Sequence, residues 1–132
     1  MTRNSKLATS ATLLLVFLCG CRKSGLPEPG TKGYADLVRA FYVGLAGLQS
    51  GEDVRAKDGL TRATQVAPGE AASWANLAIL SVRQQNLDAA YTQADQARVL
   101  APQNSRVEQL LGDIESRRGK LPESVTHLKR SV

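Results

Sequence analysis

Small and apolar residues along most of this chain return at the spacing of one helix face, not in the alternation of a strand. Trp74, Leu77 and Ala78 follow helical spacing in the middle of the chain, as do Ala90 and Ala94 just after them. The pattern predicts an all-α chain of six helices, over residues 36–49, 53–66, 71–84, 87–100, 105–118 and 121–132.

Glycine and proline mark where these helices end. Gly51 and Gly119 stand where a left-handed residue would close the first helix of a pair, and Gln85 takes that place in the middle pair. Pro68 and Pro102 follow the second helix of their pairs, because proline lacks the amide donor that a helix interior needs. The helices are therefore expected as three hairpins.

Small residues also recur at a fixed period of 34 residues. A fixed period indicates repeated helix pairs, because only small side chains let helix backbones approach closely at the same point in each unit. The units cover residues 37–70, 71–104 and 105–132, and the last is incomplete. The matched residues are Gly44, Ala78 and Gly112; Ala56, Ala90 and Ser124; and Ala63, Ala97 and Ser131.

The order of residues within each unit resembles the tetratricopeptide repeat, whose pattern is W-x2-L-G-x2-Y, then A-x3-F, then A, then P. The resemblance covers residues 36 to 132 and implies a right-handed α-solenoid of about three helix-turn-helix repeats. The middle unit fits best, with Trp74, Leu77-Ala78, Ala90, Ala94, Ala97 and Pro102.

Two positions of the pattern depart from the family. Ala40 and Glu108 stand where the family has tryptophan, and Gly47, Ser81 and Glu115 stand where it has tyrosine. Because these positions pack one helix against its partner, we expect looser packing in the first and third units than in the second.

The N-terminus resembles a bacterial lipoprotein signal. Arg3 and Lys6 precede an apolar stretch at residues 7–18 that is too short to span a bilayer, so residues 1–20 are predicted to be a cleaved signal peptide. The sequence Leu-Cys-Gly-Cys that ends at Cys21 looks like a lipobox, which implies that Cys21 becomes the lipidated first residue. A plain secretory signal and an uncleaved membrane anchor are the alternatives.

Residues 21–35 are predicted to be the lipidated cysteine and a flexible tether, because they are rich in glycine and proline and poor in apolar side chains. The expected location is the bacterial cell envelope, with the repeats facing the periplasm or the exterior. Arg22 follows Cys21 in place of the aspartate that retains many lipoproteins at the inner membrane, which favours the outer membrane.

The charge of the chain does not indicate a nucleic-acid partner. The formal net charge is +5, and Arg3 and Lys6 of the signal peptide supply two of those charges. No aromatic residues alternate with the basic residues near the C-terminus, and an exported chain rarely meets nucleic acid. Those residues are Arg117, Arg118, Lys120, Lys129 and Arg130.

No catalytic, metal or cofactor site can be assembled from the predicted mature chain. His127 is the only histidine, lipidation of Cys21 would leave no free thiol, and the carboxylates are scattered over helix surfaces. The repeat phase places His127 on the outward part of the last helix. We therefore expect a protein that is not an enzyme.

The tetratricopeptide resemblance implies a binding groove along the first helix of each pair. This groove would grade from apolar near Phe41 to basic near Arg106 and suit a peptide or helix with a hydrophobic anchor and an acidic end. Alternatively, the N-terminal segment or the neighbouring repeat covers the apolar members. The groove residues are Val38, Phe41, Leu45, Leu48, Gln49, Ala72, Ala75, Ile79, Val82, Arg83, Arg106, Gln109, Asp113, Ser116 and Arg117.

The last unit raises a question about its outer face. Ser105 and Glu108 resemble a capping box, but the last helix carries Val125, Leu128 and Val132 on one face without a polar closing helix. That face predicts self-association through this end or a longer natural polypeptide. Two functions follow: an adaptor or assembly lipoprotein that binds another envelope protein, or the N-terminal module of a larger exported protein.

Overall fold

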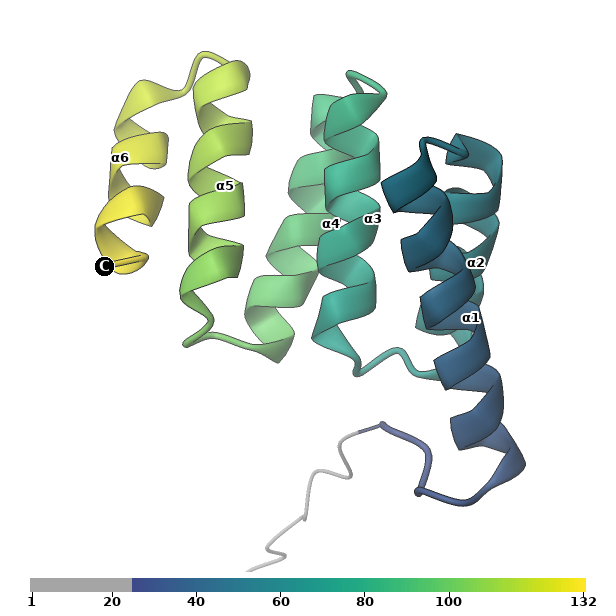
Figure 1. Cartoon of the computed structure of the whole chain (residues 1–132). Coiled ribbons are helices and arrows are strands. Elements are labelled where there is room, and N and C mark those ends of the chain that lie inside the picture. The colour runs from purple at the N-terminus through teal and green to yellow at the C-terminus, as the bar shows by residue number, and fades with distance from the viewer. Residues whose placement is uncertain (1–24) are drawn as a thin grey trace, which may run out of the picture.

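A computed structural model describes residues 25–132, which form six α-helices (Figure 1). Cys21, the signal peptide and the first part of the tether lie outside the described residues. None of the helices within residues 25–132 is both long and apolar enough to cross a membrane. The helices are α1 (Lys32–Ser50), α2 (Asp53–Val66), α3 (Ala71–Arg83), α4 (Leu87–Leu100), α5 (Ser105–Arg117) and α6 (Leu121–Arg130).

The predicted hairpins are confirmed, and they stack in a row (Figure 1). The helices pair as α1 with α2, α3 with α4, and α5 with α6, and the hairpins meet through α2 with α3 and α4 with α5. Within residues 25–132, α1 contacts α3 and α3 contacts α5, whereas the even-numbered helices do not contact one another. The odd-numbered helices therefore line the inner, closer-packed face, and the even-numbered helices form the outer face.

The turns use the residues that the sequence indicated. Gly51 and Gly119 both have a φ of 79°, and Gln85 has a φ of 60°, so all three are left-handed as a helix C-terminus requires. Helix α1 begins earlier than predicted, because Thr31 caps it by accepting a hydrogen bond from the backbone N–H of Tyr34. Residues 32–35, predicted to be tether, are therefore helical.

The central core is built on small residues. Ala78, Ala90 and Ala94 are fully buried, and they let Leu111 and Ile114 of α5 pack against the second hairpin. Trp74 lies at the edge of this core, and its indole N–H donates to the carbonyl of Pro68 at 2.9 Å.

The expectation of loose packing in the first unit is wrong. Helices α1 and α2 touch through their backbones, and a Cβ atom added at Gly44 would lie 2.6 Å from the backbone nitrogen of Leu60. A Cβ atom added at Gly47 would meet the nitrogen of Ala56 at the same distance. The glycines shorten the distance between the helices instead of leaving a gap.

Two expectations about the third unit are also wrong. Asn104, not Ser105, is the N-cap of α5, and its side chain accepts from the backbone N–H of Arg106. His127 does not point outward: its Nδ1 lies 2.8 Å from Oε2 of Glu108, and both side chains are nearly buried between α5 and α6. A buried carboxylate needs such a partner, so Glu108 draws the imidazole inward.

Candidate protein-binding groove

The inner face carries two adjoining hollows. The first, called the aromatic hollow, has a volume of about 590 Å³ and lies between residues 26–29, α1 and the start of α3. The second, called the arginine hollow, has a volume of about 420 Å³ and lies between α3 and the start of α5. Glu70 and Ala72 line both, so the two hollows adjoin on the inner face and together involve residues of all three repeats; they are called the groove.

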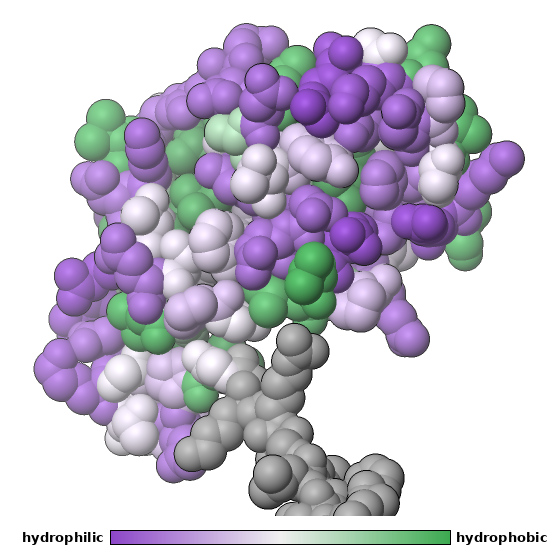
Figure 2. Space-filling view, turned by 180° about the vertical axis from the view of Figure 1, so that it is seen from behind, coloured by the Kyte–Doolittle hydropathy of each residue, from purple (hydrophilic) through white to green (hydrophobic). Residues whose placement is uncertain are grey.

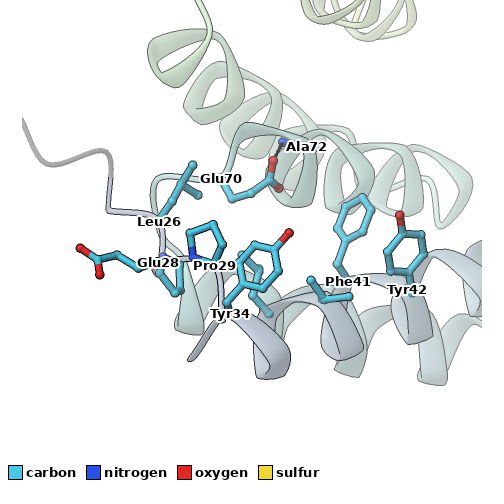
Figure 3. A pocket seen from close by; sticks show the side chains of 11 residues that line it. Leu26, Glu28, Pro29, Tyr34, Phe41, Tyr42, Glu70 and Ala72 are labelled. Atoms are coloured by element: carbon cyan, nitrogen blue, oxygen red, sulfur yellow. Dashed lines mark hydrogen bonds between the residues drawn. The ribbon is translucent and has the colours of Figure 1, made fainter. Parts of the chain in front are cut away.

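The aromatic hollow is walled by rings from α1. Tyr34, Phe41 and Tyr42 rise toward Glu70 and Ala72, while the segment before α1 closes one end (Figure 3). The Phe41 and Tyr42 rings meet edge to face, with centroids 5.6 Å apart. Phe41 is half-buried against the core of the first repeat, whereas Tyr42 is 62% exposed at the rim. The hollow therefore has a partly buried apolar base and a solvent-exposed aromatic rim.

Glu70, at the junction of the hollows, is held by the helix that follows it. Its carboxylate accepts from the backbone N–H of Ala72 at 3.1 Å and from the N–H and hydroxyl of Ser73 at 2.6 and 2.8 Å. The positive end of α3 offsets part of this negative charge. The Glu70 carboxylate is consequently held in one position where the two hollows adjoin.

The arginine hollow has one cation, Arg106, on the first turn of α5. The exposed side chain of Ile79 forms part of its apolar lining, together with alanines of α3 and with Val107 and Leu110 of α5. The groove thus changes from aromatic to mixed apolar and basic along its length. Predicted groove residues that line at least one of the two hollows are Val38, Phe41, Ala72, Ala75, Ile79 and Arg106.

The other predicted positions lie outside the hollows. Leu45, Leu48 and Val82 are half-buried, and Val82 packs against the central core. The N-terminal segment borders the hollow but leaves Phe41 open to it. The remaining exposed positions are Gln49, Gln109, Asp113, Ser116 and Arg117.

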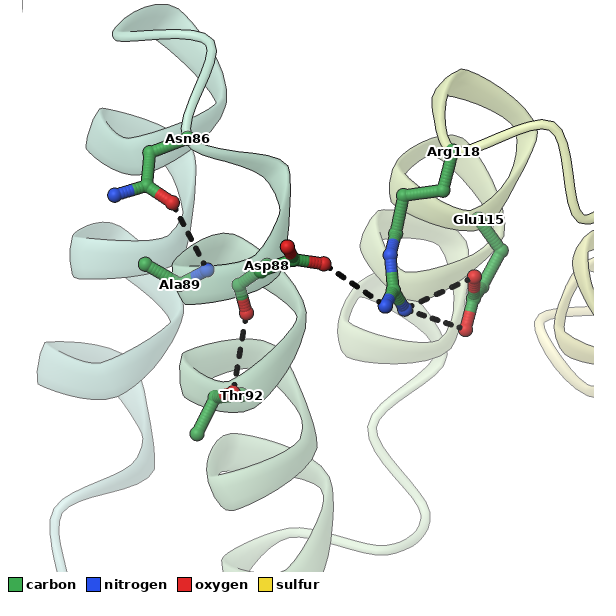
Figure 4. A network of polar contacts seen from close by, with 6 residues as sticks. All are labelled: Asn86, Asp88, Ala89, Thr92, Glu115 and Arg118. Carbon is green, nitrogen blue, oxygen red and sulfur yellow. Dashed lines mark hydrogen bonds and ion pairs between the residues drawn. The ribbon is translucent and has the colours of Figure 1, made fainter.

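Arg83, which the resemblance assigns to the groove, takes part in a contact between repeats. Its guanidinium pairs with Asp53 of α2 and donates to the carbonyl of Leu48 at 2.7 Å. Arg118 does the same at the next junction, where it reaches Asp88 at 3.0 Å and Glu115 at 3.3 Å (Figure 4). Both arginines join one repeat to the next.

Sequence reasoning missed the rim residues of the aromatic hollow. Tyr34 and the segment 26–29 fell within the predicted tether, although Thr31 three residues before Tyr34 is a typical N-cap signal. Tyr42 stands directly after Phe41, outside the positions that the repeat family uses for ligands.

Residues 25–132 contain few of the side chains that are most common in catalytic and metal sites. They contain no cysteine, their single histidine is engaged with Glu108 away from the groove, and they hold no cluster of metal-ligating side chains. The outer face is mainly hydrophilic, with apolar residues scattered among polar ones (Figure 2). The inner groove therefore combines an apolar hollow, walled by aromatic rings, with a polar end.

The fold and groove together define an all-helical repeat solenoid of the tetratricopeptide type. No protein-family model matches the chain, and no curated protein sequence matches it. A crystal structure of MamA is similar with a TM-score of 0.69 and 21% identity, over 72% of this chain and 56% of the MamA chain.

Two further MamA structures give the same result. A point mutant matches with a TM-score of 0.67 and 19% identity, over 73% of this chain and 70% of that one. The structure designated MSR-1 C2 matches with a TM-score of 0.67 and 19% identity, over 74% and 56%. This chain thus spans little more than half of the first MamA structure, and the likeness establishes the fold.

Proposed function

We propose that this protein is a non-catalytic adaptor that binds an extended peptide or a helix of another protein along its inner groove. The observation that carries the proposal is that the two hollows adjoin at Glu70 and Ala72 on the inner face. A ligand that fills both would touch all three repeats. An open groove along the inner helices is a common way for helical repeats to bind proteins.

The groove favours one direction of binding. An apolar side chain that buries about 100 Å² in the aromatic hollow would contribute about 2.5 kcal/mol. Glu70 lines both hollows, but Glu28 lines only the aromatic hollow and repels an acidic group there, whereas Arg106 lines only the arginine hollow and attracts one. The preferred ligand therefore has its apolar anchor at Phe41 and its acidic part at Arg106.

Capture of partners from native envelopes by full-length protein, after crosslinking, tests this assignment. Ala72→Arg fills the junction of the hollows from an exposed position, and Arg106→Glu reverses the charge. We expect both to lose the partner that the unchanged protein captures, while Lys57→Glu on the exposed surface of α2 keeps it. Equal capture by all four proteins, each with the same helical content, would refute the groove.

The second part of the proposal concerns where the protein is located and how it is anchored. We infer from the lipobox that Cys21 carries the lipid that holds the adaptor at the envelope, with the outer membrane as the preferred site. Cys21→Ser should abolish incorporation of a labelled fatty acid and leave the protein unanchored. Unchanged labelling of Cys21→Ser would show that the lipid is elsewhere.

A further inference from the structure

The aromatic hollow carries negative charge and no positive charge. Glu28 and Glu70 contribute two carboxylates to its lining, and none of the 11 described residues that line it is a lysine, an arginine or a histidine (Figure 3). The whole chain has a formal net charge of +5, so the negative sign is a local property of this hollow. The hollow therefore attracts a cation and repels an anion.

The Glu70 carboxylate can accept one further hydrogen bond. Among the described residues, its Oε1 accepts from the backbone N–H of Ala72, and its Oε2 accepts from the backbone N–H and the hydroxyl of Ser73. A carboxylate offers about four acceptor positions, two on each oxygen, so Oε1 retains one. Because these bonds already hold the side chain in place, a ligand that pairs with Glu70 does not have to order it.

The protein holds one of its own arginines with the same kinds of group, between the second and third repeats. The Arg118 guanidinium pairs with Asp88 and Glu115 (Figure 4). It also lies over the ring of Tyr91, 4.6 Å from the ring centroid. The Asp88 side chain is exposed, whereas that of Glu115 is buried. The surroundings of Arg118 are thus a tyrosine ring, an exposed carboxylate and a less exposed one.

The aromatic hollow presents the same groups without the arginine. Tyr34 and Tyr42 supply exposed rings, Glu28 supplies the exposed carboxylate, and Glu70 supplies the less exposed one. The two tyrosines rise from α1 toward Glu70 (Figure 3). A planar guanidinium stacks on an aromatic ring and points its fork of N–H donors at a carboxylate, which the ammonium of lysine cannot do in the same way. These surroundings therefore favour arginine over lysine.

We propose that the aromatic hollow binds an arginine side chain of the partner segment, with the guanidinium stacked on a tyrosine ring and paired with Glu70, while Glu28 adds attraction from its exposed position. This inference rests on the proposed function, because it concerns one residue of the segment that the groove binds. The aliphatic part of the arginine packs beside the apolar anchor at Phe41, and the hollow of about 590 Å³ has room for both. The partner segment is therefore bipolar, with its acidic part at Arg106.

Selection from a random peptide library displayed on phage tests this inference separately from the groove itself. The full-length protein is the bait, and groove binders are the peptides that Ala72→Arg fails to retain. Among these we expect arginine to be enriched severalfold at one position next to an apolar residue. Groove binders without that enrichment would overturn the arginine site and leave the groove standing. A selection with no peptide lost to Ala72→Arg would overturn both.

The affinity of the most enriched peptide measures the contribution of its arginine. Replacement of that arginine by methionine, which keeps most of the aliphatic length, should weaken binding about tenfold because a charge-assisted contact is lost. Fluorescence anisotropy with the labelled peptide gives both dissociation constants. Equal affinity of the arginine and methionine peptides would overturn the arginine site.

Reversal of the exposed charge shows where the arginine binds. Glu28→Lys should weaken the arginine peptide about threefold, because an exposed charge contributes modestly. Glu123→Lys is the matched control, since Glu123 is an exposed acid on the first turn of α6 and does not line the groove. A peptide with glutamate in place of its arginine should bind Glu28→Lys better than the unchanged protein. Equal effects of Glu28→Lys and Glu123→Lys would contradict binding in the aromatic hollow.

Two basic residues of this chain, Arg22 and Lys23, precede the described residues and are the internal competitors for the hollow. The selection is therefore repeated with Arg22→Ser and Lys23→Ser combined. We expect the same arginine peptides from both proteins. Arginine peptides obtained only with the serine variant would show that the chain fills its own hollow, and they would overturn the assignment to a partner.

Discussion

The first and last hairpins fill equivalent interior positions with opposite chemistry. Ala40 and Gly47 of α1 occupy the repeat positions that Glu108 and Glu115 occupy in α5, and all four residues are buried. In the first hairpin these positions hold a methyl group and a hydrogen atom, which are small enough for the two helix backbones to touch. In the last hairpin two carboxylates are buried, and His127 and Arg118 reach in to pair with them.

The comparison shows that the repeat determines which positions are buried, but not which side chains fill them or how polar side chains there are paired. A glycine contact between backbones has no room for added atoms, because neither helix can yield locally. A buried carboxylate has room but requires its partner. The first hairpin should therefore be sensitive to added volume and the last hairpin to lost partners.

Gly44→Ala should have the largest effect on stability. Its Cβ would meet the Leu60 backbone nitrogen at 2.6 Å, so the helices must separate and the free energy of unfolding should fall by about 3 kcal/mol. Urea unfolding measures the change. Gly33→Ala is the matched control, because its Cβ would meet only side-chain atoms, of Pro27 at 3.3 Å and of Thr31 at 3.8 Å. Equal stability of both variants would contradict the close contact of α1 with α2.

His127→Leu should cost less, about 2 kcal/mol, by leaving the Glu108 carboxylate buried without its partner. Addition of Glu108→Leu should recover most of that loss, because an apolar pair can replace a buried ionisable pair. Chemical denaturation of the single and double variants separates the cost of losing the histidine from the cost of leaving the carboxylate buried and unpaired. A double variant less stable than His127→Leu would show that the pair stabilises α6 in another way.

Arg118→Ala should have an intermediate effect, about 1.5 kcal/mol, and Arg83→Ala a smaller one of about 0.5 kcal/mol. The Arg118 side chain is 19% exposed and pairs with the buried Glu115, whereas that of Arg83 is 37% exposed. Thermal unfolding of the two variants ranks the junctions. The reverse ranking would mean that the arginine–aspartate pairs between repeats contribute more to stability than the pairing of the buried Glu115 carboxylate.

Lys32→Ala should have the smallest effect on stability and a clear effect on titration. The Lys32 ammonium donates to Asp36 at 2.6 Å and holds the pKa of that carboxyl below its usual value. This stabilisation is present above the usual pKa of aspartate and is lost as the pH falls through the lowered value. Carboxyl NMR should show the Asp36 pKa rising in the variant, and an unchanged pKa would disprove the pairing.

Much of the fold could be predicted because period, glycine and proline are local signals. The bounds of α2 and α4 agree with the predicted ranges, and α3 and α5 end one residue earlier. The start of α1 was missed because glycine and proline nearby obscured the Thr31 cap. The pairing of His127 could not be predicted from the repeat phase, since the family pattern has no acid at the position of Glu108.

The groove could be predicted only in outline. Phe41, Ile79 and Arg106 line the two hollows, because repeat registry places those positions on the inner face. The pairing of Arg83 with Asp53, thirty residues earlier, could not be predicted, because registry does not reveal which side chains face each other between repeats. The rim at Tyr34 and Tyr42 depends on a short segment outside the repeats.

Photocrosslinking from two positions tests the binding groove most directly. A photoreactive amino acid at position 42 lies on the rim of the aromatic hollow, and the same residue at position 99 lies off the groove on α4 with a similar exposed fraction, 62% against 58%. In living cells, a partner crosslinked from position 42 and absent from position 99 is the predicted result. Crosslinks from position 99 alone, or identical products from both, would contradict an inner-face groove.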